Sequence, residues 1–201
     1  IRGTGVYVEV EPNRTYVCTC YGEAELASVV DPGLAASSPF RAAALGVARR
    51  RGVPVATVRG GDVYRLGRLR LRALWPDGPG LASEDPNGNA VVLLVSYGAT
   101  DVLLTADAES DATSRLPLRP VEVLKVAHHG SEDPGLADLL RSTRPRAAVI
   151  SVGADNDYGH PRRETVDALA ASPGLRLWRT DENGQVVVES DGTDLTVRAE
   201  R

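Results

Sequence analysis

The chain contains three histidines, and each of them stands where an apolar run gives way to a turn. His128 and His129 follow Leu-Lys-Val-Ala and precede a glycine, whereas His160 lies within Tyr-Gly-His-Pro, downstream of the apolar run 147–152. Asp107 occupies the same kind of corner after a shorter apolar run. Neutral imidazoles and a carboxylate are ligands that suit zinc, manganese or iron. The spacing therefore predicts a metal site at the ends of several strands.

The two adjacent histidines cannot both serve such a site in the same way. Neighbouring residues of a strand point to opposite faces, so either His128 or His129 faces the site, and the sequence does not choose between them. The other residue would hold the loop or contact a substrate. His160 precedes Pro161 at the expected start of a helix, where an imidazole could donate to a leaving oxygen, contact a phosphate or simply cap the helix.

Two further groups of charged residues could form a functional site or could have only a structural role. Asp155 and Asp157 form the Asp-x-Asp pair of a magnesium-dependent phosphotransfer site, or they are solvated carboxylates of a loop. Arg68, Arg70 and Arg72 alternate with apolar residues, which predicts that all three share one face of a strand. They would bind phosphates there, or they would keep an edge strand from aggregating.

Periodicity and turn residues predict the elements that carry these side chains. Strands are expected at 6–10, 53–58, 63–66, 69–74, 91–95, 102–105, 121–126, 147–152, 175–178, 185–189 and 195–197, and helices at 39–51, at 133–141 with Asp133 as the cap, and at 161–171. Apart from its one strand, the segment 1–27 is expected to be poorly organised. Strands and helices in this mixed order are typical of layered α and β structure.

Composition limits the classes of protein that the chain can represent. Its 201 residues correspond to one ordinary domain. The net charge of −4 excludes a protein that coats nucleic acid through bulk charge, so any DNA contact must be local. No apolar stretch approaches the roughly 20 residues of a membrane span, and Cys18 and Cys20 are interpreted as incidental thiols. Because it lacks methionine and begins with Ile1, the chain is expected to be a fragment.

Four groups of residues resemble, in order and spacing, the C-terminal metallo-β-lactamase-like domain of the ComEC family of DNA internalisation competence proteins. They are Asp107–Glu109, Leu124–Ser131, Ile150–Gly153 with Tyr158–Pro161, and Arg179–Asp181 with Gly184. The resemblance covers residues 28–201 and leaves 1–27 unmatched. It implies a single domain of the α/β class with α+β layers, a metallo-β-lactamase-like αββα sandwich that is incomplete at its N-terminus.

The resemblance also implies an activity, a cofactor and partners. The family role is metal-dependent hydrolysis of DNA phosphodiesters during DNA uptake, with zinc or manganese as the cofactor. Asp107 would bridge two metal ions, His128 and His129 would form the metal-binding histidine pair, and Asp107 and His160 would be catalytic. The substrate would contact Ser131, His160, Arg68, Arg70 and Arg72. The membrane channel of the parent protein would be a partner, which places the domain on the outer side of a bacterial cytoplasmic membrane.

The chain departs from the family at the metal site. The family's His-x-His-x-Asp-His loop, which supplies most of the ligands, would precede residue 28 and is absent from the sequence. Ala106 also stands where the family usually has glycine. Each zinc ion normally takes three or four protein ligands, so the site is expected to be incomplete and the nuclease activity impaired. The alternative is a non-catalytic module on the same fold that binds DNA or the channel.

Overall fold

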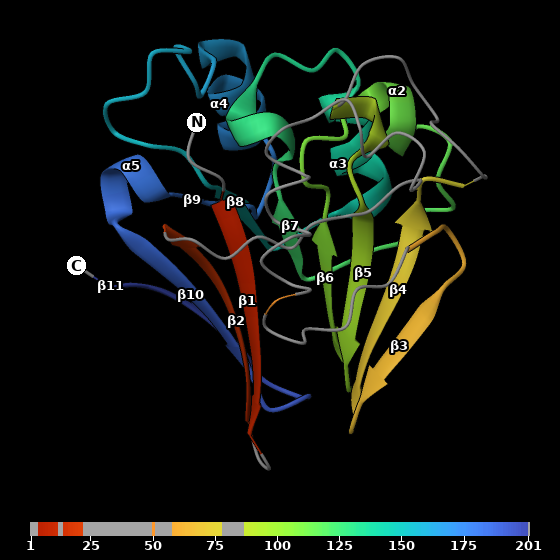
Figure 1. Cartoon of the computed structure of the whole chain (residues 1–201). Helices are drawn as coiled ribbons and strands as arrows, with labels where there is room; N and C mark the ends of the chain where they lie inside the picture. The colour runs from red at the N-terminus through yellow and green to blue at the C-terminus, as the bar shows by residue number, and fades with distance from the viewer. Residues whose placement is uncertain (1–3, 12–13, 22–49, 51–57, 78–86, 201) are drawn as a thin grey trace.

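A seven-stranded sheet and a four-stranded sheet pack face to face in the computed structural model (Figure 1). The structure describes residues 4–11, 14–21, 50, 58–77 and 87–200. The large sheet has the strand order β3-β4-β5-β6-β7-β8-β9. Its strands are β3 (Val63–Leu66), β4 (Leu69–Trp75), β5 (Val92–Tyr97), β6 (Thr100–Leu104), β7 (Val123–Lys125), β8 (Ala147–Ile150) and β9 (Arg176–Arg179). The layering of α and β structure that the sequence predicts is confirmed.

The two halves of the large sheet differ in strand direction. The strands from β3 to β6 pair antiparallel, whereas those from β6 to β9 are parallel. Parallel neighbours need crossover connections, which contain α2 (Ser110–Thr113), the 3-10 turn η3 (Ala127–Gly130), α3 (Leu136–Thr143) and α4 (Arg163–Ala170). Because the strands run in the same direction, the carboxyl ends of β6, β7 and β8 meet at one edge of the sheet.

Alternate residues of the parallel strands enter two apolar cores, as the period of a strand requires. The first core joins the sheet to the helices and includes Leu103, Leu124, Ile150, Leu139 and Leu169. The second core joins the two sheets and includes Val102, Leu104, Val123, Val149, Val186 and Val188. Both faces of these strands are therefore buried, which explains why their sequences are continuous apolar runs.

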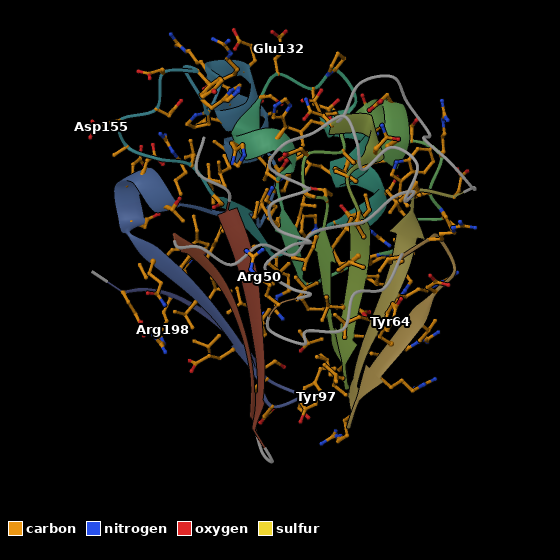
Figure 2. The ribbon with its side chains drawn as sticks, viewed as in Figure 1. Arg50, Tyr64, Tyr97, Glu132, Asp155 and Arg198 are labelled. Carbon is orange, nitrogen blue, oxygen red and sulfur yellow. The ribbon has the colours of Figure 1, made fainter. Side chains whose placement is uncertain are left out.

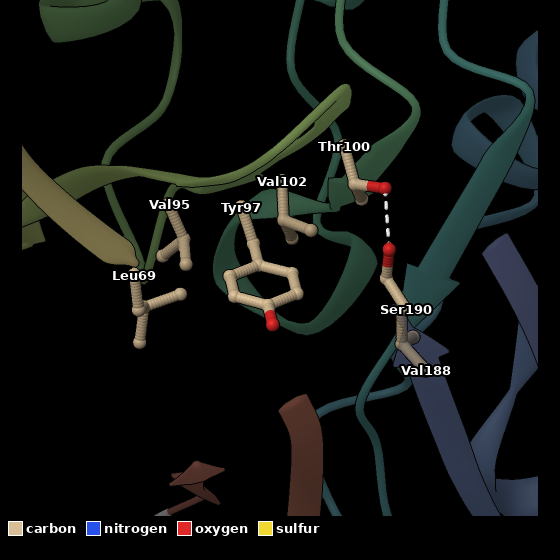
Figure 3. Close-up of a pocket in the computed structure, with 7 residues that line it drawn as sticks. All are labelled: Leu69, Val95, Tyr97, Thr100, Val102, Val188 and Ser190. Carbon is tan, nitrogen blue, oxygen red and sulfur yellow. Dashed lines mark hydrogen bonds between the residues drawn. The ribbon is translucent and has the colours of Figure 1, made fainter. Parts of the chain in front are cut away.

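A small cavity lies between the two sheets (Figure 3). It is lined by Leu69, Val95, Tyr97, Thr100, Val102, Val188 and Ser190. The hydroxyl oxygens of Thr100 and Ser190 are hydrogen-bonded at 2.6 Å and tie the two sheets together. A volume of ≈ 20 Å³ leaves room for about one water, so this cavity is not a substrate site.

The small sheet joins the two ends of the chain. Its order is β1-β2-β10-β11, with β1 (Thr4–Glu11), β2 (Arg14–Tyr21), β10 (Gln185–Ser190) and β11 (Leu195–Glu200), and every pair is antiparallel. The expectation that only one strand forms in the segment 1–27 is wrong, because β2 pairs with both β1 and β10. Its sequence, Arg-Thr-Tyr-Val-Cys-Thr-Cys-Tyr, is rich in Thr, Tyr and Val, which favour strands.

Two helical details also differ from the expectation. The third helix, α3, begins at Leu136, and the Asp133 carboxylate accepts N–H bonds from Gly135 at 3.0 Å and from Ser110 at 3.3 Å. Asp133 thus ties the loop before α3 to the start of α2. A one-turn helix that was not among the predicted helices, α5 (Thr180–Asn183), stands between β9 and β10.

Several expected features lie outside the described residues. They are the helix at 39–51, apart from Arg50, most of the strand at 53–58, and any helical layer on the outer face of the small sheet. The αββα arrangement therefore stays a prediction. The longest helices in the described ranges, α3 and α4, have eight residues each, and none is long and apolar enough to cross a bilayer.

Candidate functional site

All three histidines of the chain lie in loops that follow the carboxyl ends of β7 and β8, and Asp107 follows β6. Figure 2 shows Glu132, close to His129 in the chain, at the helix-bearing end of the molecule and Tyr97 at the opposite end. In open α/β sheets, ligands bind at the carboxyl ends of the strands. We call the residues that meet here, Asp107, Glu109, His128, His129 and His160, the strand-end cluster.

The His129 ring is oriented by a hydrogen bond to the backbone after β8. Its Nδ1 lies 2.7 Å from the carbonyl oxygen of Ser151, and because a carbonyl only accepts, Nδ1 carries the hydrogen and Nε2 keeps a lone pair. That Nε2 lies 3.7 Å from Oδ1 of Asp107. Burial lowers the pKa of His129, against the opposing effect of its bond to Ser151, so the ring is neutral near pH 7.

His128 has a different carboxylate as its partner. Its Nδ1 lies 2.8 Å from Oε1 of Glu109, and the Ser131 hydroxyl donates to the same oxygen. Two adjacent histidines are therefore matched with two carboxylates that are two positions apart, His129 with Asp107 and His128 with Glu109. Strand alternation does not cause this separation, because both histidines lie beyond β7 with left-handed φ values of 45° and 55°.

Hydrogen bonds to Lys125 of the neighbouring strand β7 fix the turn that carries Asp107. Ala106 has a φ of 49°, the left-handed region that favours glycine. Its carbonyl accepts bonds from Lys125 Nζ at 2.7 Å and from the His128 N–H at 3.1 Å, and the Thr105 hydroxyl donates to the Lys125 carbonyl at 2.7 Å. Burial lowers the pKa of Lys125 from 10.5 to about 8, against the opposing effect of Asp107. The ends of β6 and β7 thus hold each other through side chains.

His160 completes the strand-end cluster from the loop after β8. Its ring centroid lies 5.6 Å from that of His128. Asn156 fixes the backbone of His160, because it accepts the His160 N–H at 3.0 Å and donates to the His160 carbonyl at 2.7 Å. The ring Nδ1 is buried without a hydrogen-bond partner among the described residues. Burial, followed by the charges of His128 and Arg162, lowers the pKa of His160.

The other predicted site residues lie elsewhere or have other partners. Arg70 and Arg72 are exposed on β4, and the Arg68 guanidinium lies 5.0 Å from the centroid of the Tyr97 ring. Asp155 and Asp157 are exposed in the loop after β8, and Figure 2 shows Asp155 at the periphery. The two cysteines, Cys18 and Cys20, lie on β2.

Two members of the site were missed in the sequence. Glu109 stands two positions after Asp107, within a group of residues that already pointed to the site, and its spacing was the available signal. Lys125 was missed because lysine is rarely buried, so its residue type predicted an exposed side chain. Its ammonium is buried and bonds to the turn before Asp107.

Two side chains of the strand-end cluster that could donate to a metal ion lie close together. Asp107 and His129 offer one oxygen and one nitrogen at close range, and His129 has the tautomer that a ligand needs. Within the described ranges, no group of three or more His, Cys, Asp or Glu side chains is arranged to hold an ion. A zinc site normally has three or four protein ligands. Asp107 and His129 are therefore two donors, fewer than the three or four that a zinc ion normally takes.

No protein-family model matches the chain. ComE operon protein 3 of Bacillus subtilis is 32% identical over 154 residues, which are 75% of this chain and 20% of that protein. Recombination protein 2 of Haemophilus influenzae is 36% identical over 41% of this chain and 11% of its own length. Competence protein ComA of Neisseria gonorrhoeae is 33% identical over 50% of this chain and 15% of its own length.

The chain thus spans a fifth or less of the length of each of these relatives. The similarity to the Bacillus protein extends over most of the chain, so it is not confined to one short motif. These similarities support the resemblance to ComEC-type competence proteins that the residues of the strand-end cluster indicate.

Proposed function

We propose that this chain is the part of a competence protein that acts on DNA during uptake, by slow hydrolysis of phosphodiester bonds at the strand-end cluster. The names of the relatives support the role in competence. The observation that carries the chemistry is the close approach of His129 Nε2 to Asp107 Oδ1, at 3.7 Å, with the ring held by Ser151. The channel of the parent protein, in a bacterial cytoplasmic membrane, would be the partner that delivers DNA to the outer-facing domain.

The two histidine–carboxylate pairs have different roles in this proposal. Asp107 and His129 would hold a zinc or manganese ion, which when bound polarises a phosphate oxygen and lowers the pKa of a water molecule. Glu109 holds the Nδ1 side of His128, so the opposite nitrogen, Nε2, is left to contact the phosphate or move a proton. His160 lies next to His128 and would contact the leaving oxygen.

Low activity follows from the ligands that the chain lacks. The sequence has three histidines, and all of them already belong to the strand-end cluster. Beyond His128 and His160, these 201 residues therefore offer no further imidazole to Asp107 and His129. The histidine-rich loop that the family resemblance implies has no counterpart in them. We expect weak metal binding and, as a result, weak cleavage.

The test compares substitutions in the two pairs. Labelled DNA is incubated with manganese and the purified wild type, Asp107→Asn, Glu109→Gln and, as a control, Asp157→Asn, whose carboxylate is exposed in a loop. Manganese binding is measured by calorimetry. We expect Asp107→Asn to lose both metal binding and cleavage, and Glu109→Gln to bind metal but cleave about 10- to 100-fold more slowly. The control should match the wild type.

Two outcomes would contradict the hydrolase assignment. One is that wild type and Asp107→Asn cleave equally, which would point to a contaminating nuclease. The other is that neither of them cleaves DNA or binds manganese. Vigorous cleavage that Asp107→Asn abolishes would confirm the chemistry and show that the expected impairment is wrong.

A second candidate function is a module that binds DNA without cutting it. Arg65 and Arg70 are cross-strand partners in the β3–β4 hairpin, and Arg72 lies two positions further on the same face of β4. All three are exposed, and none forms an ion pair with another described residue. Arginines that are not neutralised by carboxylates can contact phosphates in register along a strand. This face supports local DNA binding on a chain whose net charge is negative.

A further inference from the structure

Three aromatic rings form a row that leads from the strand-end cluster to the surface. The ring centroids of His128 and His160 are 5.6 Å apart, and those of His160 and Tyr158 are 6.3 Å apart. The planes of the His160 and Tyr158 rings differ by only 4°, which is a stacked arrangement. The row starts at a histidine bonded to Glu109 and ends at a tyrosine in the loop after β8.

Tyr158 is open to solvent although its backbone loop is fixed. The side chain is 52% exposed. The other exposed large hydrophobic residues of the described chain, Val63, Tyr64 and Leu66, all lie on β3. The Tyr158 loop is tied by Asn156, which bonds to the Gly153 carbonyl and to both the N–H and the carbonyl of His160. An exposed aromatic ring is thus presented beside the histidines on a loop with internal hydrogen bonds.

A positive charge lies next to Gly159, the residue that follows Tyr158. Arg162 is exposed, and its guanidinium packs against Gly159, with Nη1 3.2 Å from where a Cβ would stand on that glycine. It forms no ion pair with the rest of the described chain. Its charge acts on His160, whose pKa it helps to lower. An aromatic face and an unneutralised guanidinium therefore flank the same two-residue stretch, Gly159 and His160.

We propose that Tyr158 and Arg162 form a binding site for single-stranded nucleic acid at the entrance to the strand-end cluster. A base stacks on Tyr158 while the neighbouring phosphate contacts Arg162, and the strand continues past His160 to His128. Stacking on an exposed ring requires an unpaired base, because the bases of a duplex are already stacked on each other. The site rests on the proposed function in that DNA is the ligand, and it specifies the form of DNA that enters.

The experiment measures binding in the presence of EDTA, so that hydrolysis plays no part. The probes are a short labelled oligothymidylate, a duplex of the same length and a strand with abasic positions, which keeps the phosphates but lacks bases. The proteins are wild type, Tyr158→Ala, Tyr158→Phe and Arg162→Ser. The control is Tyr64→Ala, since Tyr64 is 40% exposed but lies on β3, far from the histidines in the sheet order.

We expect Tyr158→Ala to weaken binding of the oligothymidylate by about 5- to 100-fold, the range for loss of one stacked base. Tyr158→Phe keeps the ring and should bind like the wild type, as should Tyr64→Ala. Arg162→Ser should weaken binding of the oligothymidylate and of the abasic strand alike. The duplex and the abasic strand should not distinguish Tyr158→Ala from wild type.

The proposal is overturned if Tyr158→Ala binds the oligothymidylate as wild type does, if the wild type binds no single strand, or if the loss is equal for all three probes. These results are independent of the cleavage assay. Stacking on Tyr158 without Asp107-dependent cleavage would leave the binding site standing and refute the hydrolase. Asp107-dependent cleavage without an effect of Tyr158→Ala on binding would support the hydrolase and refute the binding site.

Discussion

Titratable and charged residues cluster in two regions, the carboxyl ends of β6 to β8 and the β3–β4 hairpin. The two regions differ in whether hydrogen-bond partners orient these side chains. At the strand ends, His129 is bonded to Ser151 and His128 to Glu109. On the hairpin, Arg65, Arg70 and Arg72 face solvent without a carboxylate partner in the described chain. Hydrogen bonds orient His128 and His129 in the first region, whereas the arginines of the second are exposed and form no ion pair with the described residues.

The backbone shows the same contrast. Four non-glycine residues of the described chain have left-handed φ values, and three of them, Ala106, His128 and His129, belong to the strand ends. In the segment around the hairpin, positive φ values occur at Gly61 and Gly67. Left-handed φ costs a non-glycine residue about 1–2 kcal/mol, and such strain persists where surrounding contacts hold it. The strand ends thus hold a fixed backbone geometry, whereas the hairpin presents exposed charge.

The largest difference is expected between two glycine substitutions. Gly130 has a φ of +81°, and a Cβ there would lie 2.7 Å from the Pro161 Cβ and 3.3 Å from Ile150. Gly67 has a φ of +58°, but nothing lies within 4 Å of its added Cβ. Gly130→Ala should lower the free energy of unfolding by about 2–5 kcal/mol, through crowding and strain. Gly67→Ala should cost about 1–2 kcal/mol, through strain alone. Urea denaturation measures both, and equal losses would remove the contrast.

A second test uses the buried ammonium of Lys125. Between its folded pKa of about 8 and its ordinary value of 10.5, the unfolded chain keeps the proton and the folded chain loses it. The unfolded state then binds more protons, so the contribution of Lys125 to the free energy of unfolding rises with pH over this window, by up to about 3 kcal/mol. Below pH 8 the burial cost is present in full.

Lys125→Met should remove this rise. The difference in the free energy of unfolding, Lys125→Met minus wild type, should be largest below pH 8. It should decrease as the pH approaches 10.5, because the wild type gains stability over that window. Arg70→Met, on the exposed hairpin, is the control and should follow the wild type at every pH. Parallel profiles for Lys125→Met and wild type would mean that the ammonium is not desolvated in the folded protein.

The smallest expected effect on stability belongs to the hairpin. Replacing Arg70 and Arg72 with serine should change the free energy of unfolding by less than about 0.5 kcal/mol. The double variant should nevertheless bind duplex DNA with a log–log salt slope about 2 units shallower, because each arginine neutralises one phosphate. Arg68→Ser tests the third arginine, whose guanidinium lies over Tyr97. Unchanged salt slopes would show that these arginines are ordinary solvated residues.

Much of the large sheet could be predicted from the sequence because its signals are local. Apolar runs predicted β6, β7 and β8, and the histidines and Asp107 at their ends were correctly expected at one edge of the sheet. The carboxyl ends of parallel strands meet whatever the details of the loops. The start of α4 was also within two residues of its predicted position.

What could not be predicted depends on tertiary contacts. The left-handed φ of Ala106 is not favoured by alanine. The bond between His128 and Glu109 joins residues 19 positions apart, so which carboxylate each histidine would face had no local signal. Lys125 is buried against the usual preference of lysine. The strand β2 was missed although its residue types favour strands and its partner β1 precedes it directly; only its second partner, β10, comes from the other end of the chain.

The pairing of β2 with β10 also has a consequence for the order of folding. Thr19 and Val186 are register partners although roughly 170 residues separate them, and contacts of such long separation slow folding because the loop must close first. The β6-to-β9 half of the large sheet, by contrast, joins near neighbours in the chain. During synthesis the edge of β2 that pairs with β10 therefore stays open until β10 has been made. Until then, its unpaired N–H and C=O groups are a template on which another extended chain could pair.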